Sequence, residues 1–317
     1  MNLAEIFINE HGRIRSGWRA TIFLLALVFL SSVFGVIFGA IFYLFPISFF
    51  NKRLTGFFIQ NFILLASALF LGWLCGKFLE GLSFRALGAS FTKNWLKDFG
   101  LGLLFGTLSI CFATLITIVF GAASFQLNRD AGQAAILSTL AVSLLVFIAG
   151  AAAEEAFFRG YVLQTFTRAR LALLAIALTS LFFALAHLRN PNANYIGMLN
   201  TILAGIWFSV AYLKTRTLWL AFGLHLAWNW IQGAFLGSPV SGITDITIAP
   251  LLRMTNTGAI FLNGGDYGIE GGIACAISLI IFTLIIWFLP FFRPTEEMLI
   301  LTSEENPKIN SPAKINS

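Results

Sequence analysis

Long runs of apolar residues, separated by short polar segments, dominate the chain. A transmembrane α-helix needs about 20 predominantly apolar residues. Eight runs approach this length, although the fifth is at the short end: Trp18–Phe45, Phe57–Phe78, Phe99–Ala122, Ala134–Thr167, Leu171–His187, Tyr195–Leu213, Leu218–Phe235 and Gly271–Phe292. The pattern therefore predicts an all-α, polytopic membrane protein with about eight transmembrane helices.

The composition agrees with this class. Of the 317 residues, 58% are hydrophobic and 11% are charged, and the mean hydropathy is +0.86. A soluble domain has about 25% charged residues. The net charge of +6 needs no nucleic-acid partner, since Lys and Arg gather in segments that flank the apolar runs. Cys75, Cys111 and Cys275 lie in apolar stretches without metal-binding spacing, so we expect no disulfide framework.

Lysine and arginine are distributed unevenly between the two ends of the predicted helices. With Arg159 set aside as buried, 14 lie on the side of the N-terminus and 5 on the opposite side. Cytoplasmic loops carry such an excess. We therefore expect a multi-pass protein of the cell membrane with both termini in the cytoplasm.

These patterns divide the chain into four parts. Residues 1–133 contain the first three helices, and residues 134–235 contain the next four, which carry the candidate chemistry. An external Gly-rich loop and the last helix occupy residues 236–293, and residues 294–317 form a polar tail that we expect to be disordered. The Gly-rich tract predicts turns. Its loop is either a flexible connector or a lid over a cavity.

Three ionisable residues within the fourth apolar run are the main candidates for function. They are Glu154, Glu155 and Arg159. An ionisable side chain at membrane depth costs about 2.5–3.5 kcal/mol and usually serves a function. On a helix, Glu155 and Arg159 share a face and can neutralise one another, whereas Glu154 points away from both. Glu154 is therefore the residue expected to face a cavity.

Two of the three histidines also lie within apolar runs. His187 closes the sequence Phe183-Ala-Leu-Ala-His187, and His225 lies four residues before Asn229, on the same helical face. His11 lies in the polar N-terminal segment and is expected to be solvated. Counted along antiparallel helices from the turn at 169–171, Glu154 and His187 reach the same depth. The sequence thus predicts that these polar groups converge.

A carboxylate beside two imidazoles suits the activation of water. Glu154 can act as a general base, or it can bind zinc together with His187 and His225. An amide such as that of Asn229 can donate a hydrogen bond to the oxyanion of a tetrahedral intermediate. The chain has neither a His-Glu-x-x-His helix nor a Gly-x-Ser-x-Gly elbow.

These residues resemble the three motifs of one family. Glu154-Glu155-x-x-x-Arg159, Phe183-x-x-x-His187 and His225-x-x-x-Asn229 are similar to the signatures of the CPBP family. That family comprises the CaaX-processing type II endopeptidases and the bacteriocin-processing or self-immunity (Abi) proteins. The core of the resemblance covers residues 134–235. An N-terminal Gly-Arg-Ile-Arg-Ser-Gly-Trp-Arg segment is similar to bacterial members, which implies a bacterial plasma membrane.

The resemblance implies an intramembrane endopeptidase with a role for each motif residue. Glu154 would be the general base, helped by His187, and His225 and Asn229 would hold the oxyanion. Glu155, Arg159 and Phe183 would support the site. The resemblance leaves open whether one zinc ion is bound. The implied substrate is a membrane-associated peptide or a prenylated CaaX-type protein.

Two other functions compete with this interpretation. A non-enzymatic immunity or scaffold protein of the same family is one, but a scaffold gains nothing from keeping costly polar groups in the membrane. An ion transporter is the other, and the absence of an inverted repeat or of paired half-helices in the sequence weighs against it. The sequence does not identify the substrate or the oligomeric state.

Overall fold

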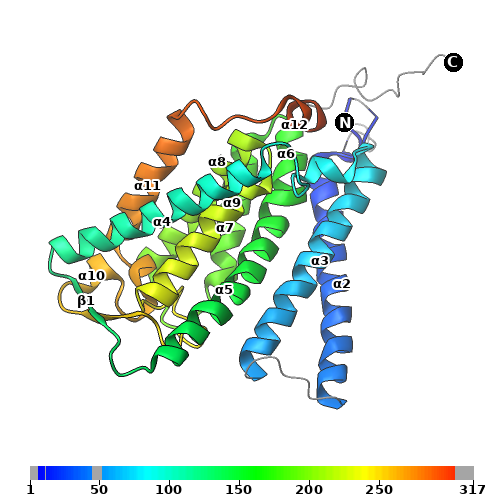
Figure 1. The fold of residues 1–317 in the computed structure, drawn as a ribbon. Coiled ribbons are helices and arrows are strands. Elements are labelled where there is room, and N and C mark those ends of the chain that lie inside the picture. Colours follow the sequence, from blue (N-terminus) through cyan, green and yellow to red (C-terminus); the bar gives the residue numbers. More distant parts are fainter. Residues whose placement is uncertain (1–5, 11, 45–51, 304–317) are drawn as a thin grey trace.

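The computed structural model describes residues 6–10, 12–44 and 52–303. In this part of the chain, long helices run up and down through one bundle, and α2 (Ser16–Leu44) begins at the end of the bundle where the short helix α12 (Glu296–Leu301) also lies (Figure 1). Eight apolar helices match the eight predicted runs: α2 (Ser16–Leu44), α3 (Lys52–Glu80), α4 (Trp95–Val119), α5 (Gln133–Glu155), α7 (Ala172–His187), α8 (Tyr195–Thr215), α9 (Leu218–Trp230) and α11 (Ile273–Phe288). The predicted fold class is confirmed.

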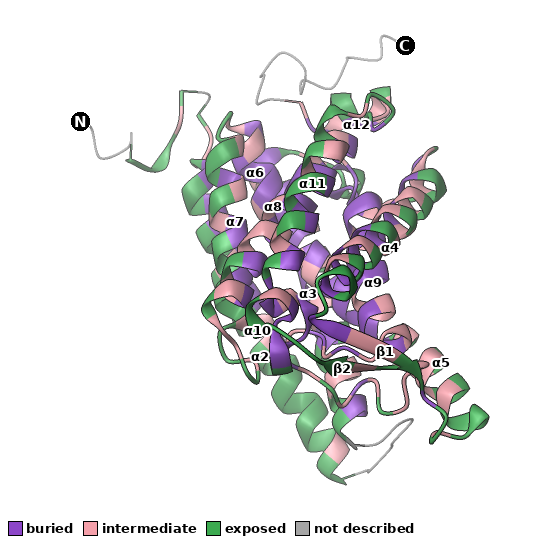
Figure 2. Cartoon of the chain, turned by 90° about the vertical axis from the view of Figure 1, so that its left-hand side faces the viewer, coloured by how far each residue is buried: buried purple, intermediate pink, exposed green. Residues whose placement is uncertain are grey.

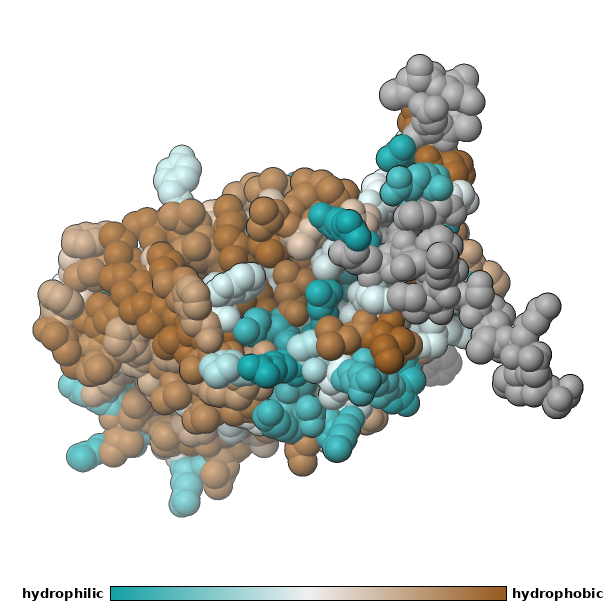
Figure 3. All heavy atoms as spheres, turned by 90° about the horizontal axis from the view of Figure 1, so that it is seen from above, coloured by the Kyte–Doolittle hydropathy of each residue, from teal (hydrophilic) through white to brown (hydrophobic). Residues whose placement is uncertain are grey.

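Length and exposure are those of membrane-spanning helices. Five helical segments are long and apolar enough to cross a bilayer, and α7 and α11 are shorter apolar helices. The C-terminal half of α2 exposes large apolar side chains such as Val36 and Ile37, while the buried residues gather in the core helices (Figure 2). Seen from above, hydrophobic residues cover much of the visible surface, and polar residues gather in one region of it (Figure 3).

The fourth predicted run is one continuous helical segment over Gln133–Arg168, longer than a simple span. It consists of α5, the π-helix η2 (Ala156–Val162) and α6 (Leu163–Arg168). A second π-helix, η3 (Ile231–Phe235), continues α9. Short π-helical segments are often found at functional sites. Here each one begins within two residues of a motif residue, after Glu155 and after Asn229.

Glycines let α9 approach α4 closely. A Cβ atom on Gly106 of α4 would lie 2.5 Å from the carbonyl oxygen of Leu224, and one on Gly223 of α9 would lie 2.5 Å from that of Phe99. Small residues allow helix backbones to meet in this way within membranes. The contact fixes the helix that carries His225 and Asn229.

A buried ion cluster joins α2, α3 and α6 near the end of the bundle at which α2 begins. Glu80 accepts hydrogen bonds from Arg19 Nη1 at 2.5 Å and from Arg168 Nη2 at 2.8 Å, and all three side chains are at most 3% exposed. Arg19 and Arg168 therefore belong to a buried network, although both were included among the 14 Lys and Arg residues on the side of the N-terminus.

The connection between α9 and α11 is folded. Its strand β2 (Leu252–Asn256) pairs antiparallel with β1 (Ala123–Leu127), and short helices follow: α10 (Ile260–Asn263), η4 (Gly265–Tyr267) and η5 (Ile269–Gly271). Tyr267 and Ile269 are fully buried. The sequence predicted neither strand. This packing disagrees with a flexible connector, one of the two predicted alternatives for the loop, and the other alternative, a lid over a cavity, stays a prediction.

The predicted disordered tail is wrong for its first part. Glu296–Leu301 form a short helix, α12, capped by the Thr295 side chain, and Met298 is buried. Glu297 pairs with Arg85 at 2.5 Å. Residues 304–317 and His11, also subjects of sequence predictions, lie outside the described residues.

Candidate active site

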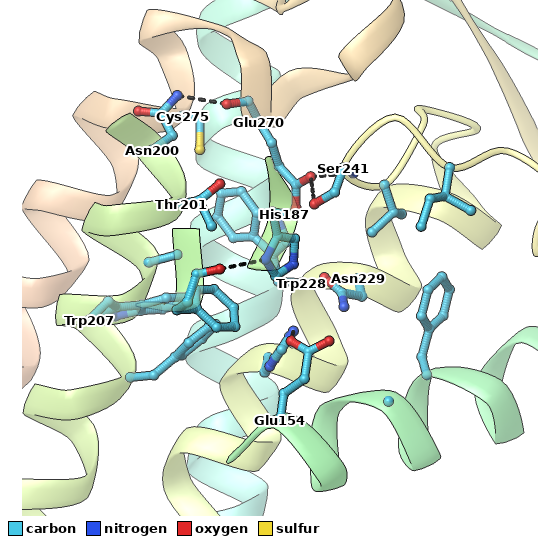
Figure 4. A pocket seen from close by; sticks show the side chains of 18 of the residues that line it. Glu154, His187, Asn200, Thr201, Trp207, Trp228, Asn229, Ser241, Glu270 and Cys275 are labelled. Carbon is cyan, nitrogen blue, oxygen red and sulfur yellow. Dashed lines mark hydrogen bonds and ion pairs between the residues drawn. The ribbon is translucent and has the colours of Figure 1, made fainter. Parts of the chain in front are cut away.

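The two adjacent glutamates end α5 and point in different directions. Oε1 of Glu155 lies 3.2 Å from Nη1 of Arg159, as the helical phasing predicts. The side chain of Glu155 is 1% exposed and that of Glu154 is 26% exposed. Oε2 of Glu154 has no hydrogen-bond partner. Glu154 is therefore the carboxylate that faces the cavity (Figure 4).

His225 lies between both glutamates. Its Nδ1 is 2.9 Å from Oε1 of Glu155, and its Nε2 is 3.7 Å from Oε2 of Glu154. An ionised carboxylate only accepts hydrogen bonds, so Nδ1 carries the proton in the bond to Glu155. Phe208 of α8 stacks on the ring at a centroid distance of 4.7 Å. The imidazole is thus held on one edge and one face, with Nε2 directed toward Glu154.

His187 is oriented by its own helix. Nδ1 lies 2.8 Å from the backbone oxygen of Phe183, one turn earlier in α7. A carbonyl oxygen only accepts, so Nδ1 is the donor and, in the neutral ring, Nε2 is left with a free lone pair. Asn194 caps the next helix by accepting from the Gly197 N–H at 2.8 Å, which makes the turn after His187 compact.

Arg159 lies in an aromatic cage rather than near solvent. The guanidinium is fully buried, and it lies 4.7 Å from the ring centre of Phe183 and 5.2 Å from that of Phe208. Its Nη2 donates to the carbonyl oxygen of Gly205 at 3.1 Å. Phe183 therefore has a supporting position, as the sequence predicts, because its ring contacts the guanidinium and its carbonyl orients His187.

One cavity brings the predicted residues together. Glu154, His187, His225 and Asn229 all line it, and they come from α5, α7 and α9 (Figure 4). Its volume is about 90 Å³, which is room for several water molecules. The convergence predicted from helical depth is confirmed. Glu155 and Arg159 lie behind this lining.

The sequence did not single out a second carboxylate in the cavity. Glu270, in η5 of the Gly-rich loop, lines it together with Ser241. Glu270 accepts hydrogen bonds from Trp228 Nε1 at 3.0 Å and from the backbone N–H and the hydroxyl of Ser241 at 2.5 and 2.8 Å. A carboxylate inside an otherwise turn-forming Gly-rich tract was the available signal, but nothing local indicates where it points.

Whether Glu154, His187 and His225 bind zinc stays a prediction. Among the described residues, no group of three or more His, Cys, Asp or Glu is arranged to hold a metal ion. Nδ1 of His225 is committed to Glu155 and Nδ1 of His187 to a carbonyl, so Nε2 is the nitrogen of each ring that could bind an ion.

Comparison with known proteins supports the resemblance noted in the sequence. A family model described as Type II CAAX prenyl endopeptidase Rce1-like matches residues 135–231. The matched segment contains all three motifs and ends just after Asn229. No curated protein and no solved structure matches the chain significantly. Residues 135–231 of the chain are therefore similar to the Rce1-like type II CAAX prenyl endopeptidases.

Proposed function

We propose that this protein hydrolyses a peptide bond in a membrane-associated peptide or a prenylated CaaX-type protein, with water activated by Glu154 and His187. The observation that carries the proposal is the Glu154 carboxylate. It has an unpartnered, buried oxygen in the cavity that His187, His225 and Asn229 also line. A carboxylate left unsatisfied at such a position costs free energy and is typical of a catalytic group.

Water activation needs two acceptors, and the cavity has them. Glu154 takes one proton from the attacking water as its oxygen bonds to the substrate carbonyl carbon. The free Nε2 of His187 accepts a hydrogen bond from the same water and orients it. Glu154 then returns its proton to the leaving nitrogen while the carbon–nitrogen bond breaks, which yields an amine and a carboxylic acid, and the acid loses its proton to solvent after release.

Stabilisation of the oxyanion falls to Asn229 and His225. The amide of Asn229 can donate as it is, whereas Nε2 of His225 can donate only when the ring is an imidazolium. Two carboxylates and one guanidinium surround this ring, so an imidazolium would bring Glu154, Glu155, Arg159 and His225 to a net charge of zero. This charge balance supports a protonated His225.

A wider space next to the cavity supports entry of an extended peptide. It has a volume of about 570 Å³ and shares the wall residues Phe57, Ile243 and Ile246 with the cavity. An exposed ion pair between Arg53 and Asp245 links α3 to the loop beside this space. A scaffold function of the same family would use the space without needing Glu154.

A cleavage assay with purified protein in lipid vesicles tests the proposal. Farnesylated CaaX peptides and peptides from a membrane extract would be incubated with wild-type protein and with Glu154→Gln, and new termini would be identified by mass spectrometry. We expect products only with the wild type, since general-base catalysis is worth about 10²–10⁴-fold. Equal products from both proteins would refute the assigned role of Glu154. Binding without cleavage would favour the scaffold.

A further inference from the structure

Helix α8 supplies part of the site although none of the three motifs lies on it. It packs against α7, α9 and the π-helix η2. Phe208 of α8 lines the cavity and is 3% exposed. The imidazole of His225 and the guanidinium of Arg159 both lie against its ring. Phe208 thus connects α8 to the first and the third motif.

The flat contact with Phe208 defines the plane of the His225 imidazole. The two rings stack with their centroids 4.7 Å apart and their planes 17° apart. The hydrogen bond from Nδ1 to Glu155 holds one corner of the imidazole and still allows the ring to tilt. On the cavity side, the 3.7 Å between Nε2 and Glu154 is longer than a hydrogen bond. The ring of Phe183 is 6.0 Å away and nearly perpendicular, so it offers no parallel face.

The same turn of α8 also holds Arg159. The carbon of its guanidinium lies 5.2 Å from the centre of the Phe208 ring, and its Nη2 donates to the carbonyl oxygen of Gly205 at 3.1 Å. A cation over an aromatic face is attracted by the quadrupole of the ring. Gly205 lies three residues before Phe208, so both contacts come from one turn of the helix.

Glu155, His225, Phe208 and Arg159 form a closed set of contacts. Oε1 of Glu155 accepts from Nδ1 of His225 at 2.9 Å and lies 3.2 Å from Nη1 of Arg159. The ring of Phe208 contacts both the imidazole and the guanidinium. Each member is therefore held by two others. Removal of the aromatic ring opens the set but leaves the hydrogen bonds to Glu155 in place.

We propose that Phe208 is a positioning residue for peptide hydrolysis, whose flat ring holds the imidazole of His225 so that Nε2 faces the place where the oxyanion forms. This inference rests on the proposed function and adds a residue outside the three motifs to it. The requirement is for a planar side chain at position 208 rather than for apolar volume alone. An aliphatic side chain fills the core but presents no flat face to the imidazole.

Cleavage kinetics of Phe208→Leu and Phe208→Tyr test the inference. Both variants would be assayed in lipid vesicles with a farnesylated CaaX peptide, or with the membrane peptide that the cleavage assay identifies. Loss of an oxyanion donor costs about 10²–10³-fold in kcat, so a misaligned donor in Phe208→Leu should lower kcat roughly tenfold or more. KM should stay at the wild-type value, because the contact matters in the transition state. Phe208→Tyr keeps the flat ring and should retain most of the wild-type kcat.

Phe282→Leu is the matched control. Phe282 of α11 belongs to the same apolar core cluster as Phe208 and is also buried, but its ring contacts are Phe105 and Phe112 of α4, at 6.4 and 6.3 Å. The substitution removes the same atoms, so the melting temperature should fall in both leucine variants, and kcat should fall only in Phe208→Leu. Equal kcat values in the two leucine variants, or an equal loss in Phe208→Leu and Phe208→Tyr, would overturn the inference.

The histidine signals in an NMR spectrum report the contact without any substrate. The chain has three histidines, so isotope-labelled histidine gives few ring signals, and that of His225 is the one lost in His225→Gln. Protons that lie over an aromatic face resonate upfield. The His225 signal should therefore move downfield in Phe208→Leu, by more than the His187 signal does, and should not move in Phe282→Leu. An unmoved His225 signal, or a larger change at His187, would overturn the inference.

The two levels of failure are distinguishable. If wild-type protein cleaves neither kind of peptide, the proposed function fails and the role of Phe208 in catalysis falls with it. If wild-type protein and Phe208→Leu cleave with equal kcat, the proposed function stands and only the role of Phe208 is overturned.

Discussion

Oε1 of Glu155 accepts from Nδ1 of His225 at 2.9 Å, and the same oxygen lies 3.2 Å from Nη1 of Arg159. One carboxylate oxygen therefore serves two partners 70 and 4 residues away in the chain. Glu155 therefore neutralises a buried guanidinium and also determines which nitrogen of His225 faces the cavity.

The first prediction contrasts the two glutamates. Glu155→Gln should lower the free energy of unfolding by about 3–5 kcal/mol, the cost of breaking a buried ion pair. It should also reduce kcat, because His225 loses the acceptor that orients it. Glu154→Gln should abolish cleavage while the melting temperature stays near the wild-type value. A stable, inactive Glu155→Gln beside an active Glu154→Gln would show that the roles are reversed.

The second prediction concerns the contact between α7 and α8. A Cβ atom on Gly205 would lie 2.7 Å from Cα of Ser180, so Gly205→Ala must push the two helices apart. Overpacking of this kind costs about 1–3 kcal/mol. The shift would also move the carbonyl oxygen that holds Arg159. We expect a lower melting temperature and a lower kcat.

Gly150→Ala is the matched control for Gly205→Ala. Gly150 lies in α5 beside the cavity, but a Cβ atom there would meet Phe57 at 3.8 Å, an ordinary contact. Its melting temperature should equal that of the wild type or exceed it. Equal destabilisation by both alanines would mean that the close approach at Gly205 has no special role.

The third prediction concerns metal. If Glu154, His187 and His225 bind zinc, purified protein should hold about one equivalent by mass spectrometry, and dialysis against a strong chelator should abolish cleavage until zinc is added back. Full activity in metal-free protein would show instead that the side chains alone activate the water.

The fourth prediction is the topology inferred from the charge bias. Asn263 in the Gly-rich loop is buried, so it is unsuitable for labelling, whereas Ile248 is 72% exposed. In a variant with Cys111 replaced by serine, Ile248→Cys should react with an impermeant maleimide added to intact cells. Lys93→Cys, near the other end of the bundle, should react only after permeabilisation. The opposite result would reverse the orientation.

The sequence by itself determined the helices and four residues of the cavity. The length of an apolar run and a spacing of four residues are local properties, because helical geometry converts them directly into spans and faces. The pairing of Glu155 with Arg159, the free carboxylate of Glu154 and the common depth of Glu154 and His187 follow from that geometry alone.

Only the tertiary structure decided the contacts of Glu270, the partners of Glu80 and the pairing of the two strands. These contacts join residues far apart in the chain, and no periodic pattern in the sequence indicates them. The carboxylate of Glu270 reaches the cavity through glycine turns and bonds to Trp228 and Ser241, 42 and 29 residues away. Glu80 accepts hydrogen bonds from arginines 61 and 88 residues away in the chain. Strand β1 pairs with β2 although the helices α5, α7, α8 and α9 lie between them in the chain. The polarity of these residues is visible in the sequence, but the loop paths that bring them together are not.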